Sequence, residues 1–112
     1  MAKPLNFKTM KRNYWTVTLD DENGTTLMLT TPTKAVFDKI VAMKDDLSDN
    51  EEDVNAETLD DLYEVCKEIL NSNKTHTHFT LEEVGEMLKY DDIIALIHGY
   101  TSFISEVASQ KN

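Results

Sequence analysis

The chain has 112 residues and a formal net charge of −10 at pH 7. This length suits one domain and excludes two ordinary ones, and the negative charge disfavours nucleic acid or an anionic membrane surface as a partner. The single cysteine excludes an internal disulfide. Neither a signal peptide nor an apolar run long enough to span a membrane is visible, so we expect a protein of the reducing cytosol.

The basic residues are concentrated at the start of the chain. Residues 1–13 hold four cations (Lys3, Lys8, Lys11 and Arg12) and no acid, which leaves 7 basic and 21 acidic side chains in the remainder, a formal charge of −14. Residues 1–12 are weakly patterned, and we expect a basic N-terminal arm or a short edge strand. The predicted organisation is therefore this arm, a single domain over residues 13–109, and a frayed tail at 110–112.

Two runs of alternating apolar and polar residues, 14–19 and 25–31, predict a β-hairpin. A two-residue loop at 23–24 would turn the leucines of the second run to the wrong side. A three-residue loop at 22–24 pairs Leu19 with Leu27 and gives Gly24 the left-handed conformation that such loops use. It also pairs Val17 with Leu29. Because a lone hairpin is marginal in water, its apolar face should pack on helices; that face consists of Trp15, Val17, Leu19, Leu27 and Leu29.

A first helix is expected after the hairpin, with Thr31 as the N-terminal cap and Pro32 in the first turn. Its apolar stripe consists of Val36, Phe37, Ile40, Val41 and Leu47. The helix should end in the acidic run 45–53. That run resembles a calcium-binding loop in composition only, because it lacks the central glycine and the alternating ligand spacing. We interpret it as a solvated linker.

A second helix is predicted from about Ala56 to Asn71, capped by Asn55 or a neighbour. Its apolar stripe consists of Leu59, Leu62, Tyr63, Cys66, Ile69 and Leu70. The position of the cysteine on this stripe indicates a small buried thiol rather than a reactive one. The polar loop that follows contains His76 and His78, but two ligands without a third nearby are a weak metal signal.

The sharpest local signal is the start of a short third helix. Thr80 and Glu83 form a capping box, and Phe79 with Val84 can close a hydrophobic staple around it. The pattern predicts a helix that ends near residues 88–90.

A long helix over Asp91–Ser109 has the widest apolar stripe and is the element around which the others must fold. The stripe consists of Ile93, Leu96, Ile97, Tyr100, Phe103, Ile104 and Val107. Gly99 within it indicates a close helix crossing, and His98 lies off the stripe, as a surface or hydrogen-bonded residue would. The resulting fold class is α+β, mostly α, with an N-terminal β-hairpin packed on a bundle of about four helices.

The sequence shows no clear signature of a catalytic or ligand-binding site. Its three glycines form no phosphate-binding loop, and no nucleophile stands beside a recognisable base. Paired acids such as Asp60-Asp61 and Asp91-Asp92 suit helix starts and solvated faces better than acid–base catalysis. We therefore expect no enzymatic activity, no cofactor, no catalytic or metal-binding residues, and neither nucleic acid nor a membrane as a partner.

Four segments stand in a recognisable order: Gly24-Thr25-Thr26-Leu27, Thr31-Pro32-Thr33-Lys34-Ala35-Val36-Phe37, Phe79-Thr80-Leu81-Glu82-Glu83-Val84, and Tyr100-Thr101-Ser102-Phe103-Ile104-Ser105-Glu106. This pattern over roughly residues 13–108 resembles the small tail assembly chaperones of long-tailed bacteriophages and prophages of low-GC Gram-positive bacteria. The basic arm and the loop with His76 and His78 are not part of the likeness.

The resemblance implies a non-enzymatic protein of the host bacterial cytoplasm that is absent from the mature virion or not essential to it. Such a protein binds the long helical tape-measure protein, keeps it soluble, and helps recruit tail-tube subunits. For this chain we expect several copies that associate along the partner. A longer form made by ribosomal frameshifting is common in that family. The end Gln110-Lys111-Asn112, which a run of adenines can encode, is the expected place for it.

For the partner, helix-in-groove docking is the expected mode, and Met43 and Met87 are the candidate binding residues because flexible methionines tolerate varied helical partners. Ordinary core filling is the competing explanation for both. The alternative functions are an acidic decoy that mimics DNA charge and a structural adaptor that binds a host or phage protein.

Overall fold

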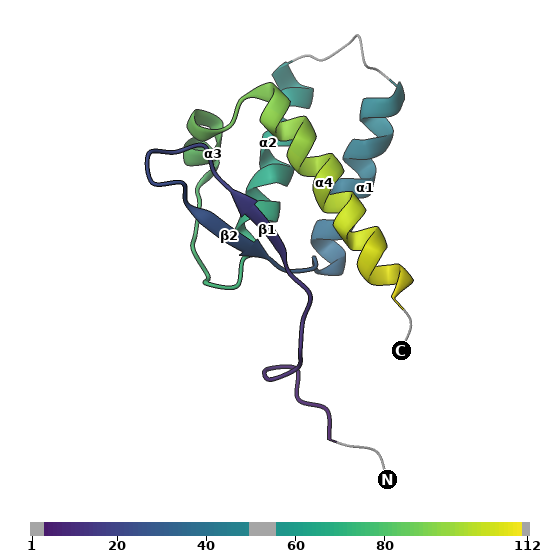
Figure 1. The fold of residues 1–112 in the computed structure, drawn as a ribbon. Helices are drawn as coiled ribbons and strands as arrows, with labels where there is room; N and C mark the ends of the chain where they lie inside the picture. Colours follow the sequence, from purple (N-terminus) through teal and green to yellow (C-terminus); the bar gives the residue numbers. More distant parts are fainter. Residues whose placement is uncertain (1–3, 50–55, 111–112) are drawn as a thin grey trace.

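The computed structural model describes residues 4–49 and 56–110. Within them the chain forms two strands and then four helices (Figure 1), which confirms the predicted α+β, mostly α, fold class. The elements are β1 (Trp15–Thr18), β2 (Thr26–Leu29), α1 (Lys34–Asp49), α2 (Ala56–Asn71), α3 (Leu81–Met87) and α4 (Tyr90–Ser109). The hairpin lies beside the helices, with β2 in contact with α2.

The two strands pair antiparallel as predicted, but the predicted register is wrong by two residues. Val17 lies opposite Leu27 and Trp15 opposite Leu29, whereas the three-residue loop would have placed Leu19 opposite Leu27. A shift of two residues preserves the alternation of sides, so the predicted faces are right. Leu19, Leu27 and Leu29 are buried, Trp15 and Val17 are half-buried, and the intervening threonines of β1 are exposed.

The side chain of Asp21 explains the longer loop. Its carboxylate accepts hydrogen bonds from the backbone N–H and the hydroxyl of Thr25, at 2.8 and 2.5 Å, and these bonds lower the pKa of the carboxyl below its usual value. Thr25 in turn accepts a bond from the N–H of Leu19 through its carbonyl, at 2.7 Å. The bond between Leu19 and Thr25 therefore closes the loop. Gly24, inside the loop, takes the predicted left-handed conformation with φ 59°.

The start of α1 is also displaced from the prediction. Thr33, not Thr31, is the cap: its hydroxyl accepts a hydrogen bond from the N–H of Val36 at 3.4 Å. Pro32 consequently precedes the cap instead of standing in the first turn. The helix continues through Asp49, so the first part of the acidic run is helical rather than a linker. Residues 50–55, with the predicted cap Asn55, and the side chain of Leu47 lie outside the described residues.

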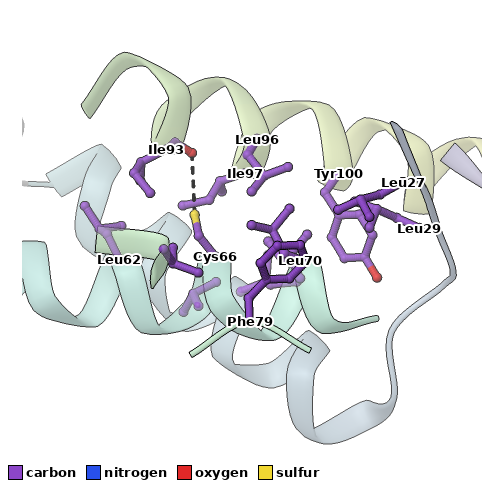
Figure 2. Close-up of a cluster of buried hydrophobic side chains, with 14 of the residues drawn as sticks. Leu27, Leu29, Leu62, Cys66, Leu70, Phe79, Ile93, Leu96, Ile97 and Tyr100 are labelled. Atoms are coloured by element: carbon purple, nitrogen blue, oxygen red, sulfur yellow. Dashed lines mark hydrogen bonds between the residues drawn. The ribbon is translucent and has the colours of Figure 1, made fainter. Parts of the chain in front are cut away.

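The core is built between α4 and α2, as Figure 2 shows, with Leu27 and Leu29 of β2 at the end where Tyr100 lies. Phe79 is also a member of this buried cluster. α4 contributes Ile93, Leu96, Ile97, Tyr100 and Phe103, and α2 contributes Leu62, Val65, Cys66, Ile69 and Leu70. The predicted stripe of α4 is confirmed at these five positions, with Ile104 and Val107 half-buried at its far end. Val65 is also buried on α2, although the predicted stripe of this helix did not include it.

Gly99 is needed for a close approach, but to a strand residue rather than to another helix. A Cβ atom at this position would lie 2.5 Å from Cη2 and 2.6 Å from Cζ2 of Trp15. The indole also packs against Tyr100 and Phe103, at centroid separations of 6.3 and 6.5 Å. The hydroxyl of Tyr100 donates to the carbonyl of Thr30 at 2.6 Å, which ties α4 to the end of β2.

The predicted capping box of α3 is confirmed. The hydroxyl of Thr80 accepts a hydrogen bond from the N–H of Glu83 at 3.2 Å, and the Glu83 carboxylate accepts one from the N–H of Thr80 at 3.0 Å. Phe79 and Val84, the two members of the staple, are both buried. The side chain of Asn71 bonds both backbone groups of Phe79, which fixes the entry to α3.

Candidate functional site

The single thiol is placed where it cannot act as a nucleophile. Cys66 is fully buried, and burial raises the pKa of its thiol to about 12. Its Sγ lies 3.9 Å from the carbonyl of Ile93, to which it donates (Figure 2). Since only the thiolate is reactive, this residue fills the interface between α2 and α4.

The histidines are on the surface. His76 and His78 are exposed in the loop between α2 and α3, and His98 lies on the exposed side of α4 in a shallow polar hollow with Ser102 and Glu106. Among residues 4–49 and 56–110, no three His, Cys, Asp or Glu side chains come together as a metal site would require. In the same part of the chain, no helix is both long and apolar enough to cross a bilayer.

The loop between α2 and α3 is organised by Asn73, a residue that the sequence pattern did not single out. Its side chain is 4% exposed and donates to the carbonyls of Leu70 and Thr77, at 2.8 and 2.7 Å. Its Oδ1 accepts from the N–H of Thr77 at 2.8 Å. These bonds account for the loop conformation, including the left-handed φ of 60° at His76.

A groove of about 300 Å³ lies beside β1. One wall is the strand itself with the residues that follow it, 15–20. The opposite wall comes from the end of α3 and the first turns of α4: Met87, Leu88, Asp92, Ala95 and Leu96. The lining is mostly apolar, and among the described residues that form it the charged ones are two carboxylates, Asp20 and Asp92. We refer to this feature as the β1 groove.

The β1 groove contains a strand edge that nothing in the described chain covers. The N–H of Leu19 donates to the carbonyl of Thr25, so these residues form a bonded pair, and in an antiparallel ladder bonded and non-bonded pairs alternate. Thr16 and Thr18 therefore belong to non-bonded pairs, and their N–H and C=O groups point away from β2, toward the groove. Within residues 4–49 and 56–110 no backbone group pairs with them. The groove thus combines apolar walls with free backbone donors and acceptors.

The two methionines singled out from the sequence do not form one site. Met87 lines the β1 groove, whereas Met43 lies on α1 and is not part of its lining. Both side chains are half-buried and pack against the core. Their role as partner-binding residues therefore stays a prediction.

A second apolar surface lies on α1. Phe37 and Val41 are one helical turn apart and remain 38% and 41% exposed. On the core side of the same helix, Ile40 is fully buried and Val36 is half-buried. The apolar stripe of α1 is thus wider than its contact with the core, and its flank faces solvent. We call these two exposed residues the α1 flank.

No protein-family model, curated protein or solved structure matches this chain. Its own geometry offers two different surfaces. The β1 groove presents a free strand edge and suits an extended segment. The α1 flank presents side chains at helical spacing and suits another helix.

Proposed function

We propose that this protein is a non-enzymatic phage tail assembly chaperone, which binds apolar helical segments of the tape-measure protein and keeps them soluble. The observation that carries the proposal is the α1 flank, where Phe37 and Val41 remain exposed one turn apart. Side chains at this spacing fit the ridge of a second helix. Met43, the partner-binding residue predicted on α1, lies on the same helix.

Of the segments that carry the family resemblance, some supply residues that stabilise the fold and one supplies an exposed residue. Phe79–Val84 builds the capping box of α3, and the segment 100–106 supplies Tyr100 and Phe103 to the core. The segment 31–37 instead contains both the cap of α1 and Phe37. The exposed residue thus lies within one of the family-like motifs, which supports a binding role for this flank.

The charge of the chain suits a solubilising role. A formal charge of −10 for each bound copy makes separate complexes repel one another. A long apolar helix covered by several such copies would carry that charge along its length. Aggregation of the tape-measure protein is then opposed both by covering its apolar side chains and by electrostatic repulsion between complexes.

The test is co-expression with the tape-measure protein, whose gene is expected immediately downstream. We expect the tape-measure protein to become soluble and to co-purify with the wild-type chain. The double variant Phe37→Ser/Val41→Ser should lose this effect, while Leu81→Ser, which alters a side chain that is 42% exposed on α3, should retain it. Thermal unfolding of each variant alone shows whether its fold is intact. An insoluble tape-measure protein with nothing co-purified would overturn the proposal, and salt-sensitive capture of DNA-binding proteins would favour the acidic decoy.

A further inference from the structure

We propose that the β1 groove binds the basic N-terminal arm of a second copy of this chain, which adds as an extended strand to the free edge of β1. Residues 4–12 of this arm are among the residues that the structure describes. This inference does not depend on the proposed function, because it uses a different surface and a different partner.

Of the two strand edges of the hairpin, only that of β1 is open in the described part of the chain. The outer edge of β2 is covered by the segment that follows α2. Thr30 donates its N–H to the carbonyl of Ser72 at 2.7 Å, and the N–H of Lys74 donates to the carbonyl of Met28 at 2.9 Å. β1 has no such cover, and an uncovered edge is a template for pairing with another extended chain.

The arm has the composition that this edge requires. Leu5 and Phe7 are 69% and 66% exposed, and Met10 is 41% exposed. Large apolar side chains at such exposure make few contacts with their own domain. Residues 6–9 form a turn in which the N–H of Thr9 donates to the carbonyl of Asn6 at 3.2 Å, and this turn must open for the arm to add as a strand. Once the arm is extended, Leu5 and Phe7, two residues apart, point to the same side. That side matches the apolar walls of the groove.

Charge also favours the pairing. The arm contains Lys8, Lys11 and Arg12 and no acid. The charged side chains in the lining of the groove are both carboxylates, Asp20 and Asp92. Unlike charges at the rim of an interface steer association and set its orientation.

A second copy is a better occupant than the arm of the same chain. The arm runs away from the domain past the end of β1 in Figure 1. To lie along its own β1 it would have to reverse direction immediately before Tyr14. The Nζ of Lys74 lies 5.2 Å from the centroid of the Tyr14 ring and holds that side chain beside the strand entry. The arm of a neighbouring copy reaches the same edge without a reversal.

The decisive experiment is a complementation between two variants, followed by light scattering during gel filtration. Phe7→Asp damages the arm and leaves the groove intact. Ala95→Arg fills the groove at an exposed position of α4 and leaves the arm intact. The wild-type chain should associate as its concentration rises. Each variant alone should run at the monomer mass of 12.8 kDa, with association weakened by about tenfold or more.

An equimolar mixture of the two variants should form a dimer, because one chain supplies an arm and the other a groove. Leu81→Asp, which introduces the same charge at another exposed apolar position, should associate like the wild type. Thermal unfolding of every variant checks that the domains are folded. Wild-type chains that stay monomeric at all concentrations would overturn the proposal. That result would be expected if each arm occupied its own groove. Variants that associate normally, or a mixture that stays monomeric although the wild type associates, would also overturn it.

Discussion

Replacing Gly99 with alanine should destabilise the protein, although the same change in a solvent-exposed helix would stabilise it by about 1 kcal/mol. The added Cβ would lie 2.5 Å from Cη2 and 2.6 Å from Cζ2 of Trp15. Ordinary carbon–carbon contacts need about 3.5–4 Å, so the indole must move by roughly 1 Å. Overpacking of this kind costs about 1–3 kcal/mol. Moving the indole also weakens its contacts with Tyr100 and Phe103, each of which stabilises the fold by about 0.5–1.5 kcal/mol.

The expected net loss is therefore about 1–2 kcal/mol of unfolding free energy, measured by urea denaturation followed by far-UV circular dichroism. A control variant that lacks the indole should reverse the sign of this change in stability. In a Trp15→Ala background the obstructing ring is gone, and Gly99→Ala should then stabilise by up to about 1 kcal/mol relative to Trp15→Ala alone. If Gly99→Ala stabilises the wild-type chain, the indole does not lie over Gly99 and the assigned packing of β1 on α4 is refuted.

Three further predictions follow from the core. Phe103→Ala should cost about 3–5 kcal/mol of unfolding free energy in urea denaturation, because the ring is 7% exposed; a loss below about 1 kcal/mol would mean that the ring is largely free. Tyr100→Phe should cost about 0.5–1.5 kcal/mol, since it removes the hydrogen bond to the Thr30 carbonyl, and an unchanged unfolding midpoint would contradict that bond. The Cys66 thiol has a pKa raised to about 12 in the folded protein from 9.0, so unfolded chains ionise first and stability falls as the pH rises from 9 toward 12. At pH 9 a thiol reagent should label denatured chains rapidly and native chains slowly, and equal rates would contradict burial.

The hairpin shows which part of the fold the sequence predicts and which it does not. Alternation determined the faces of both strands, because burial of one side forces every second residue inward. It did not determine the register, since a shift of two residues satisfies the same alternation. The choice was made by the carboxylate of Asp21, whose two bonds to Thr25 set the loop length. A local side-chain hydrogen bond of this kind has no periodic signature.

The start of α1 and the role of Gly99 were missed for related reasons. Thr31 and Thr33 are chemically equivalent caps on either side of Pro32, and only the path of the chain after β2 chooses between them. The close approach at Gly99 was predicted, but its partner, Trp15, comes from a strand 84 residues earlier in the printed sequence. Local periodicity carries no information on that pairing.

The candidate site was the least predictable part. Met43 and Met87 were chosen for their flexibility, yet the structure places them on separate helices and half-buried. The free edge of β1 depends on which edge the loop after α2 covers, and that is a property of the tertiary fold. By contrast, the inert thiol of Cys66 followed directly from its place on an apolar helical stripe.

The central claim, that the α1 flank binds an apolar helix, is tested most directly by calorimetric titration of a purified helical segment of the tape-measure protein into this chain at low and high salt. Covering what remains exposed of Phe37 and Val41 contributes about 1 kcal/mol each, so Phe37→Ser/Val41→Ser should weaken binding by about tenfold or more, and Leu81→Ser should leave it unchanged. The wild-type affinity should change little with salt, because the contact is apolar. Equal affinity of the wild type and the double variant, or binding lost in high salt, would contradict the claim.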